Sequence, residues 1–120
     1  MTTDRRAALV ALKDAVEAGD WGLEATRAAN TLFPGNRENH WSWAAYTGST
    51  AAAIDLLGAA RWAVSWSIMF EPGDVGREYQ ASIHYHTDEG MRFLHEFAPT
   101  PARALLLAIL AALLEQEAQP

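Results

Sequence analysis

The segment RWAVSWSIMF, residues 61–70, alternates large apolar side chains with smaller ones more regularly than any other part of the chain. One side of this segment would carry Trp62, Val64, Trp66, Ile68 and Phe70. Successive side chains of a β-strand point to opposite faces, so the alternation predicts a half-buried strand. Two of the five tryptophans would then share one face of a sheet, with a core stripe as the default interpretation and an open aromatic platform as the alternative.

Two more strands are predicted directly after the first. The turn sequence Glu71-Pro72-Gly73-Asp74 precedes a strand over 78–86, in which residues 79, 81, 83 and 85 alternate with the more polar 80, 82, 84 and 86. The turn Thr87-Asp88-Glu89-Gly90 then leads to a third strand over 91–97. Such short connections favour an antiparallel meander.

Helices are predicted on both sides of these strands in the chain. Three precede them, over 4–18, from Asp20 to about 33, and over 50–58, where Ser49 or Thr50 is the expected cap. Residues 36–48 have no clean helical or strand period. A long helix follows the strands, from Pro101 to about 117, with Thr100 as its cap.

The predicted order is therefore three helices, three strands and one helix in a single domain over 1–120. We expect an α+β protein, a three-layer α-β-α sandwich with a three-stranded antiparallel sheet, because large apolar groups on both faces of a sheet call for helices on both. The final helix is apolar almost all round, from Leu105 to Leu114. Such a helix is expected to touch more than one layer or a second copy, and we predict a homo-oligomer.

Composition excludes several functional classes. The chain of 120 residues has a net charge of -6 and a pI near 5.0, which disfavours binding to duplex nucleic acid. It has no cysteine, which excludes disulfides and thiolate metal sites and fits a reducing cytoplasm. No signal peptide is apparent, and the apolar run 104–114 is shorter than the ~20 residues of a membrane span.

Three segments together resemble the phage ABA-sandwich domain family of small phage and prophage proteins. They are Tyr46-Thr47-Gly48-Ser49 with the helix that follows it, Arg61-Trp62 with its alternating strand, and Ala98-Pro99-Thr100-Pro101 running into an alanine- and leucine-rich helix. The resemblance covers about residues 46–114. It implies a three-layer α-β-α sandwich in a phage or prophage setting, in the cytoplasm of an infected bacterium, and it carries over no catalytic residue.

An unusual group of side chains precedes the middle helix. Aromatic rings lie beside guanidinium, amide and imidazole groups at Arg37, Asn39, His40, Trp41, Trp43 and Tyr46. A pocket for a nucleobase and a phosphate needs these groups, since bases stack at ~1–3 kcal/mol each and arginine binds phosphate through a charge-assisted fork. The alternative is that the two tryptophans anchor an irregular segment to the core. Arg61, Arg77, His84 and His86 complete the predicted ligand-binding set.

His84 and His86 lie two residues apart, hence on one face of the second strand. With His95 or Glu96 of the next strand they would form a metal site, although a solvated polar face or a ligand-gripping face is the simpler interpretation. No nucleophile elbow or phosphate loop is present. We therefore predict no catalytic residues, no cofactor and no bound metal.

Three functions remain as hypotheses. The first is a non-enzymatic, phage-encoded counter-defence protein that sequesters a small nucleotide signal. The second is an inhibitor that binds a protein of a host defence complex, through its acidic surface. The third is a small metal-dependent hydrolase built on His84, His86 and His95.

Overall fold

The structure, a computed structural model, describes residues 2–59 and 62–118. Four helices precede the strands: α1 (Thr2–Ala18), α2 (Leu23–Leu32), α3 (Asn36–Tyr46) and α4 (Thr50–Ala59). The strands β1 (Ala63–Phe70), β2 (Tyr79–Thr87) and β3 (Gly90–Ala98) follow, and α5 (Pro101–Ala118) ends the described chain. The protein is thus α+β with a three-stranded antiparallel sheet, as predicted.

The predicted order of three helices before the strands is wrong, because residues 36–46 form α3. The apolar period is missing there for a physical reason. A polar side chain, Ser42, is fully buried on the inner side of α3, while the large apolar Trp43 is 48% exposed. The Ser42 hydroxyl donates a hydrogen bond to the Asn39 carbonyl at 2.7 Å, so its burial leaves no polar atom unpaired.

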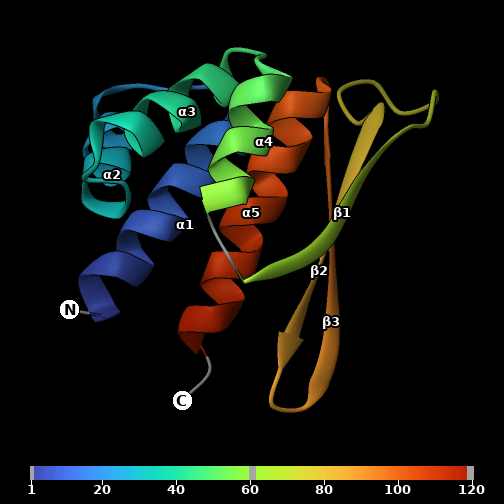
Figure 1. The fold of residues 1–120 in the computed structure, drawn as a ribbon. Coiled ribbons are helices and arrows are strands. Elements are labelled where there is room, and N and C mark those ends of the chain that lie inside the picture. The colour runs from blue at the N-terminus through green and yellow to red at the C-terminus, as the bar shows by residue number, and fades with distance from the viewer. Residues whose placement is uncertain (1, 60–61, 119–120) are drawn as a thin grey trace.

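All five helices lie on the same side of the sheet (Figure 1), whereas an α-β-α sandwich would place helices on both sides. Helix α5 packs directly on the sheet, and α1, α3 and α4 pack on the far side of α5. The layers therefore run from the sheet to α5 and then to the remaining helices. The face of the sheet that points away from α5 carries no helix among the described residues.

Helix α5 is the centre of the core. Every residue from 104 to 110 is buried, which matches its contacts with the sheet on one side and with helices on the other. The prediction that this apolar helix touches more than one layer is confirmed. Its predicted cap is confirmed as well, since the Arg103 N–H donates to the Thr100 hydroxyl at 3.2 Å.

The strands pair in a simple order, β1-β2-β3. Ile83 at the centre of β2 lies between Trp66 of β1 and Leu94 of β3, and this set of side chains points toward α5. We call the face that points toward α5 the inner face. The opposite face, which we call the outer face, is formed by Ser65, Ser67, Met69, Gln80, Ser82, His84, His86, Met91, Phe93, His95 and Phe97.

Coverage of the inner face is uneven because α5 lies mainly over β2 and β3. Trp62, just before β1, and Ile68 on β1 pack against the core, but Trp66 is 42% exposed and Phe70 is 60% exposed. The predicted core stripe is thus only half realised.

None of the described helices is both long enough and apolar enough to pass through a bilayer.

Candidate functional site

Helix α3 presents a row of polar and aromatic side chains at an open depression. Side chains three and four residues apart lie on the same side of a helix. The depression has a volume of about 600 Å³ and is lined by Asn30, Pro34, Asn36, Asn39, His40 and Trp43. It therefore combines one half-exposed indole with amide and imidazole groups, which suits a planar, uncharged ligand rather than a phosphate.

Asn39 has a structural task at this depression. Its side-chain amide donates to the Asn30 side chain at 2.7 Å and to the Phe33 carbonyl at 3.2 Å. These bonds join α2 to α3 across the Pro34-Gly35 turn. The predicted ligand contact from this amide would have to compete with both.

The other two aromatic residues of the predicted patch lie elsewhere on α3. Trp41 and Tyr46 pack against the core. The Tyr46 ring lies 5.2 Å from the Trp21 ring, and the Arg103 guanidinium stands 4.6 Å above it while donating to the Tyr46 carbonyl at 3.3 Å. Trp41 and Tyr46 therefore anchor α3 to the core and do not line a ligand pocket.

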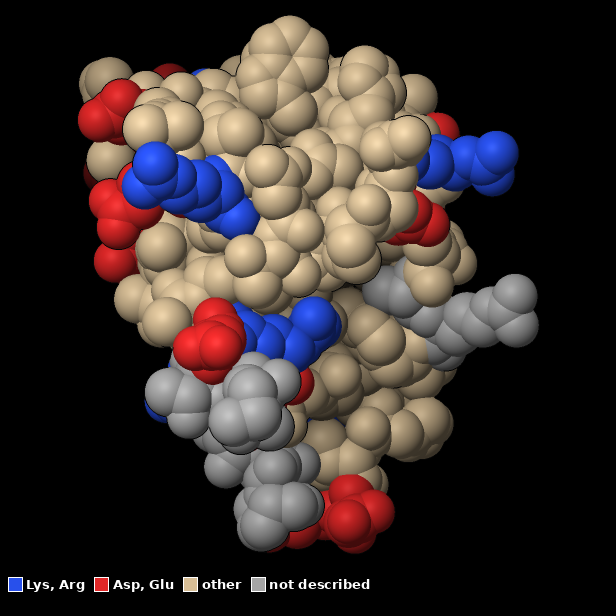
Figure 2. Space-filling view, turned by 90° about the vertical axis from the view of Figure 1, so that its left-hand side faces the viewer, with Lys and Arg blue, Asp and Glu red and all other residues tan. Residues whose placement is uncertain are grey.

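Charge around the depression is sparse. Figure 2 views the molecule from the side of α2 and α3, and the described Lys and Arg side chains on this face are scattered rather than gathered into a patch. Arg37 is exposed but is not part of the lining. The aromatic–arginine combination that the sequence suggested is thus not assembled at this depression.

The remaining predicted ligand residues lie far from α3. Arg61 falls outside the described residues. Arg77 lies in the β1–β2 connection, where its guanidinium stands 4.4 Å above the Phe97 ring. His84 and His86 are on the outer face of the sheet, on the opposite side of the molecule from α3. The predicted set therefore does not form one site.

The outer face is the largest functional candidate that the fold leaves open. None of its eleven residues is Asp, Glu, Lys or Arg, in a chain with 24 such residues among 120. Met69, Met91 and Phe93 are 52%, 40% and 55% exposed there. Met91 and Phe93 lie two residues apart on β3, and Met69 lies near the other end of the sheet on β1. Exposed apolar groups on an uncovered sheet face are typical of a protein-binding site.

Polar groups on this face are paired with one another. The Ser65 hydroxyl lies 2.9 Å from Nδ1 of His84, and the buried Ser82 hydroxyl lies 2.7 Å from Nδ1 of His95. The His84 ring also meets the Phe93 ring edge-on at 4.3 Å. These contacts hold the imidazole rings in place on the surface, so the outer face presents ordered rather than freely rotating side chains.

The hypothesis of a metal site gains no support from this arrangement. Among the described residues, no three His, Asp or Glu side chains are grouped closely enough to hold a metal ion. Alternation along β3 explains part of this, because Glu96 points to the inner face while His95 points to the outer one. The Nδ1 atoms of His84 and His95 are also engaged with serine hydroxyls.

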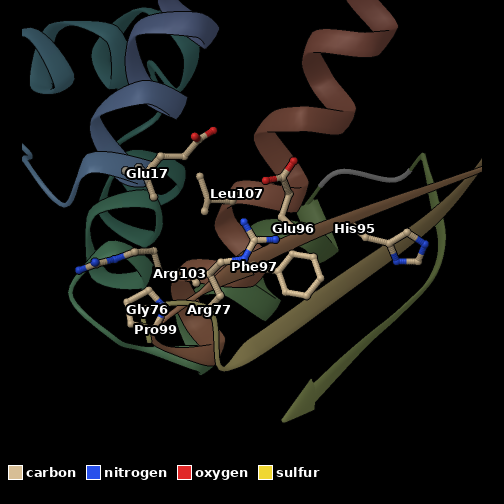
Figure 3. Close-up of a pocket in the computed structure, with 11 residues that line it drawn as sticks. Glu17, Gly76, Arg77, His95, Glu96, Phe97, Pro99, Arg103 and Leu107 are labelled. Carbon is tan, nitrogen blue, oxygen red and sulfur yellow. The ribbon is translucent and has the colours of Figure 1, made fainter. Parts of the chain in front are cut away.

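A second depression, of about 400 Å³, wraps around the free edge of β3 (Figure 3). Its charged lining residues are Glu17, Arg77, Glu96 and Arg103. Glu96 forms an ion pair with Lys13 of α1 at 3.6 Å, yet burial outweighs this attraction and raises the pKa of Glu96. Each of these charged groups already has an ion-pair partner or stands over an aromatic ring. We therefore interpret the depression as part of the packing between β3 and the helices and not as a ligand site.

The chain matches no protein-family model, no curated protein and no solved structure. The geometry of its own residues is therefore the basis for a functional conclusion.

Sequence reasoning placed His84 and His86 on one face of a strand as candidate ligand residues, but it did not identify that face as a protein-binding surface. The alternation along β2 separated Gln80, Ser82, His84 and His86 from the apolar positions. The alternation could not indicate that Met69, Met91 and Phe93 lie on the same face or that no helix covers them. Their exposure results from the packing of the described helices on the inner face alone.

Proposed function

We propose that the protein is a non-catalytic binding protein that recognises a partner protein through the outer face of its sheet. The observation that carries this proposal is an uncovered sheet face whose eleven described positions include no Asp, Glu, Lys or Arg, on which Met69, Met91 and Phe93 are exposed, in a chain with a net charge of -6. Interfaces of protein complexes are depleted of charged residues at their centres and enriched in aromatic residues and methionine. The outer face has this composition, with Met69, Met91, Phe93 and Phe97.

The shape of this surface favours a protein over a small molecule. Small-molecule sites are concave and bury most of their ligand. A three-stranded sheet face is broad and open, and three imidazole rings and three serine hydroxyls supply hydrogen-bonding groups at its centre. The sequence suggested a protein partner bound through the acidic surface of the chain. We now propose that the uncharged outer face makes the contact instead.

A particular setting for the partner rests on the sequence resemblance to phage ABA-sandwich proteins alone, since the described helices do not form the second layer that this resemblance implies. In that setting the chain would act in the cytoplasm of an infected bacterium and bind a component of a host defence system. A partner with an apolar, weakly charged surface would match the outer face best.

A substitution on the outer face tests this proposal. Phe93→Glu places a carboxylate at a position that is 55% exposed, so it should leave the fold intact while disrupting an apolar interface. Leu23→Glu on α2, where the side chain is 67% exposed, is the matched control. The wild-type protein and the Leu23→Glu variant should recover the same stoichiometric partner from bacterial lysate, and Phe93→Glu should lose it. Recovery by all three proteins would exclude the outer face as the contact.

Binding of the base of a small nucleotide-like ligand at α3, with its phosphate left in solvent, is the second candidate function. It is favoured by Trp43, whose indole is 48% exposed at the edge of the 600 Å³ depression. Stacking on an indole is worth ~1–3 kcal/mol per base and is tolerant of sequence and ring type. The neighbouring Asn36 and His40 side chains would supply hydrogen bonds to the edge of a base.

Calorimetric titration with a panel of cyclic nucleotides and ADP-ribose-type signals tests this second candidate. Binding that is abolished by Trp43→Ala and retained by Phe93→Glu would support it. Absence of heat with every ligand, at protein concentrations of about 50 µM that detect low-micromolar affinity, would remove it.

A further inference from the structure

Strand β1 is an edge strand whose outer backbone groups have no partner strand among the described residues. The Glu71 N–H donates to the Glu78 carbonyl at 2.6 Å, which identifies Glu71 as a residue whose backbone points toward β2. Backbone direction alternates along an antiparallel strand. The N–H and C=O groups of Phe70, Ile68 and Trp66 therefore point away from β2, to the free edge.

Strand β1 leaves this edge open to pairing from Ser65 onward, beyond the bulge between Ala63 and Ser65. Natural edge strands carry charged residues, proline or bulges that prevent pairing with another chain. Residues 65–70 contain none of these. The opposite edge strand, β3, differs: it carries Arg92 and Glu96, which form ion pairs with Glu115 and Lys13 of the helical layer.

The same residues that direct their backbones to the free edge also carry exposed apolar side chains. Trp66 and Phe70, on the inner face, are 42% and 60% exposed because α5 lies mainly over β2 and β3 and covers β1 only in part. On side chains of ~150–250 Å², these fractions leave roughly 200 Å² of aromatic surface open in each copy. Strand β1 therefore offers a binding partner both free backbone hydrogen-bonding groups and exposed aromatic side chains.

We propose that a second copy of this chain occupies this edge, by antiparallel pairing of β1 with the partner's β1 about a twofold axis at Ile68. The two sheets then form one continuous sheet of six strands, with both helical layers on the same side. In this register each Trp66 lies opposite the partner's Phe70, so two aromatic cross-strand pairs form between the helical layers. Trp66, Ile68 and Phe70 are also the residues that exchange backbone hydrogen bonds with the partner strand.

The composition of β1 permits pairing with a second copy. The chain has a net charge of -6, but this strand carries no charged residue, so the repulsion between two copies is weakest here. An uncharged strand paired with itself brings no like charges into opposition, and this register places Ser65 opposite the partner's Glu71. With the backbone edges and flanking side chains included, the two copies would bury roughly 1,000 Å², the lower end for a specific dimer.

Measurement of the oligomeric state tests the proposal. Sedimentation of the full chain from about 1 to about 100 µM should reveal a dimer. Phe70→Glu, at an exposed position of the inner face, should raise the dissociation constant of the dimer at least about 10-fold, because it places a carboxylate opposite the indole of the partner's Trp66. Phe93→Glu on the outer face is the matched control and should leave the dimer unchanged. This control also separates the dimer from the proposed function, because Phe93→Glu should lose the partner protein and keep the second copy.

A single thiol tests the register. The chain has no cysteine, so Ile68→Cys introduces the only one. In a hydrogen-bonded antiparallel pair the two Cα atoms are about 5.5 Å apart, within the range of a disulfide. A mild oxidant such as diamide, which accepts the two electrons, should convert Ile68→Cys to a covalent dimer. Val75→Cys, at a 96% exposed loop position, should stay mainly monomeric.

Two results would overturn the proposal. One is a monomer at all concentrations together with no disulfide from Ile68→Cys. The other is a dimer that persists in Phe70→Glu and dissociates in Phe93→Glu, which would place the contact between copies on the outer face.

Discussion

Lys13 of α1 and Glu96 of β3 form an ion pair, with 3.6 Å between Nζ and Oε2, that joins the first helix to the last strand. Burial opposes the charge on both side chains. Burial alone would lower the pKa of Lys13, but the carboxylates of Glu17 and Glu96 outweigh the effect of burial, so the pKa of Lys13 is raised. For Glu96 burial prevails, and its pKa is raised despite the nearby ammonium group.

The raised pKa of Glu96 predicts a specific dependence of stability on pH. A carboxyl group with a higher pKa in the folded state contributes stability below its ordinary pKa of 4.5 and loses it as the pH rises through the folded value. The free energy of unfolding of the wild type, relative to Glu96→Gln, should therefore increase as the pH falls from 7 toward 4.5. Urea unfolding of both proteins measures this difference. Glu24→Gln, on the exposed side of α2, controls for loss of a charge, and an equal pH response in both variants would contradict the prediction.

Tyr85 predicts a second dependence, at alkaline pH. Its side chain is 1% exposed, and burial together with the nearby Glu115 carboxylate raises its pKa to about 12. A tyrosine in the unfolded chain ionises near pH ~10, so this contribution to stability is complete below pH ~10 and is lost between ~10 and 12. The loss should amount to on the order of 2 kcal/mol and be absent in Tyr85→Phe. Ionisation of all three tyrosines together near pH ~10 in a near-ultraviolet titration would refute it.

The central position of α5 predicts a large effect of truncating its side chains. Leu106 is fully buried, so Leu106→Ala should lower the free energy of unfolding by about 2–5 kcal/mol through lost burial and the cavity left behind. Leu23→Ala, at a 67% exposed position, should change it by less than about 0.5 kcal/mol. Denaturant unfolding monitored by circular dichroism gives both values. A loss below about 1 kcal/mol for Leu106→Ala would argue against the layer order described above.

The two tryptophans of α3 should respond differently to removal. Trp41 packs against the core, and Trp41→Ala should cost about 3 kcal/mol or more. Trp43 is 48% exposed at the depression, so Trp43→Ala should cost less than about 1 kcal/mol. The same unfolding experiment compares them. Similar losses for both would mean that Trp43 is also part of the core.

The sheet and the buried helix could be predicted from the sequence because each element has its own periodic signal. The period of two in residues 61–70 and 79–86 places the strands, and the apolar run after Pro101 predicts a helix that contacts two layers. Helix α3 could not be predicted this way. Its buried side includes Ser42 and its exposed side includes Trp43, which reverses the usual pattern.

The candidate site was harder to predict than the fold because it depends on what is missing from one side of the sheet. Trp66 and Phe70 have the pattern of core residues, and only the position of α5 over β2 and β3 leaves them exposed. Likewise, Trp41 and Trp43 are close in the sequence but point in different directions on a helix, so Trp41 packs against the core while Trp43 is exposed. Exposure of this kind follows from tertiary packing rather than from local sequence.

Site-specific photo-cross-linking at position 93 tests the central claim, that the outer face binds a partner, most directly. A benzophenone side chain there, on β3 beside His84 of the uncharged face, should yield one dominant adduct with a partner protein when the chain is irradiated in bacterial extract. The same group at position 23 on α2 should yield none. Adducts from position 23 and none from position 93 would contradict the account.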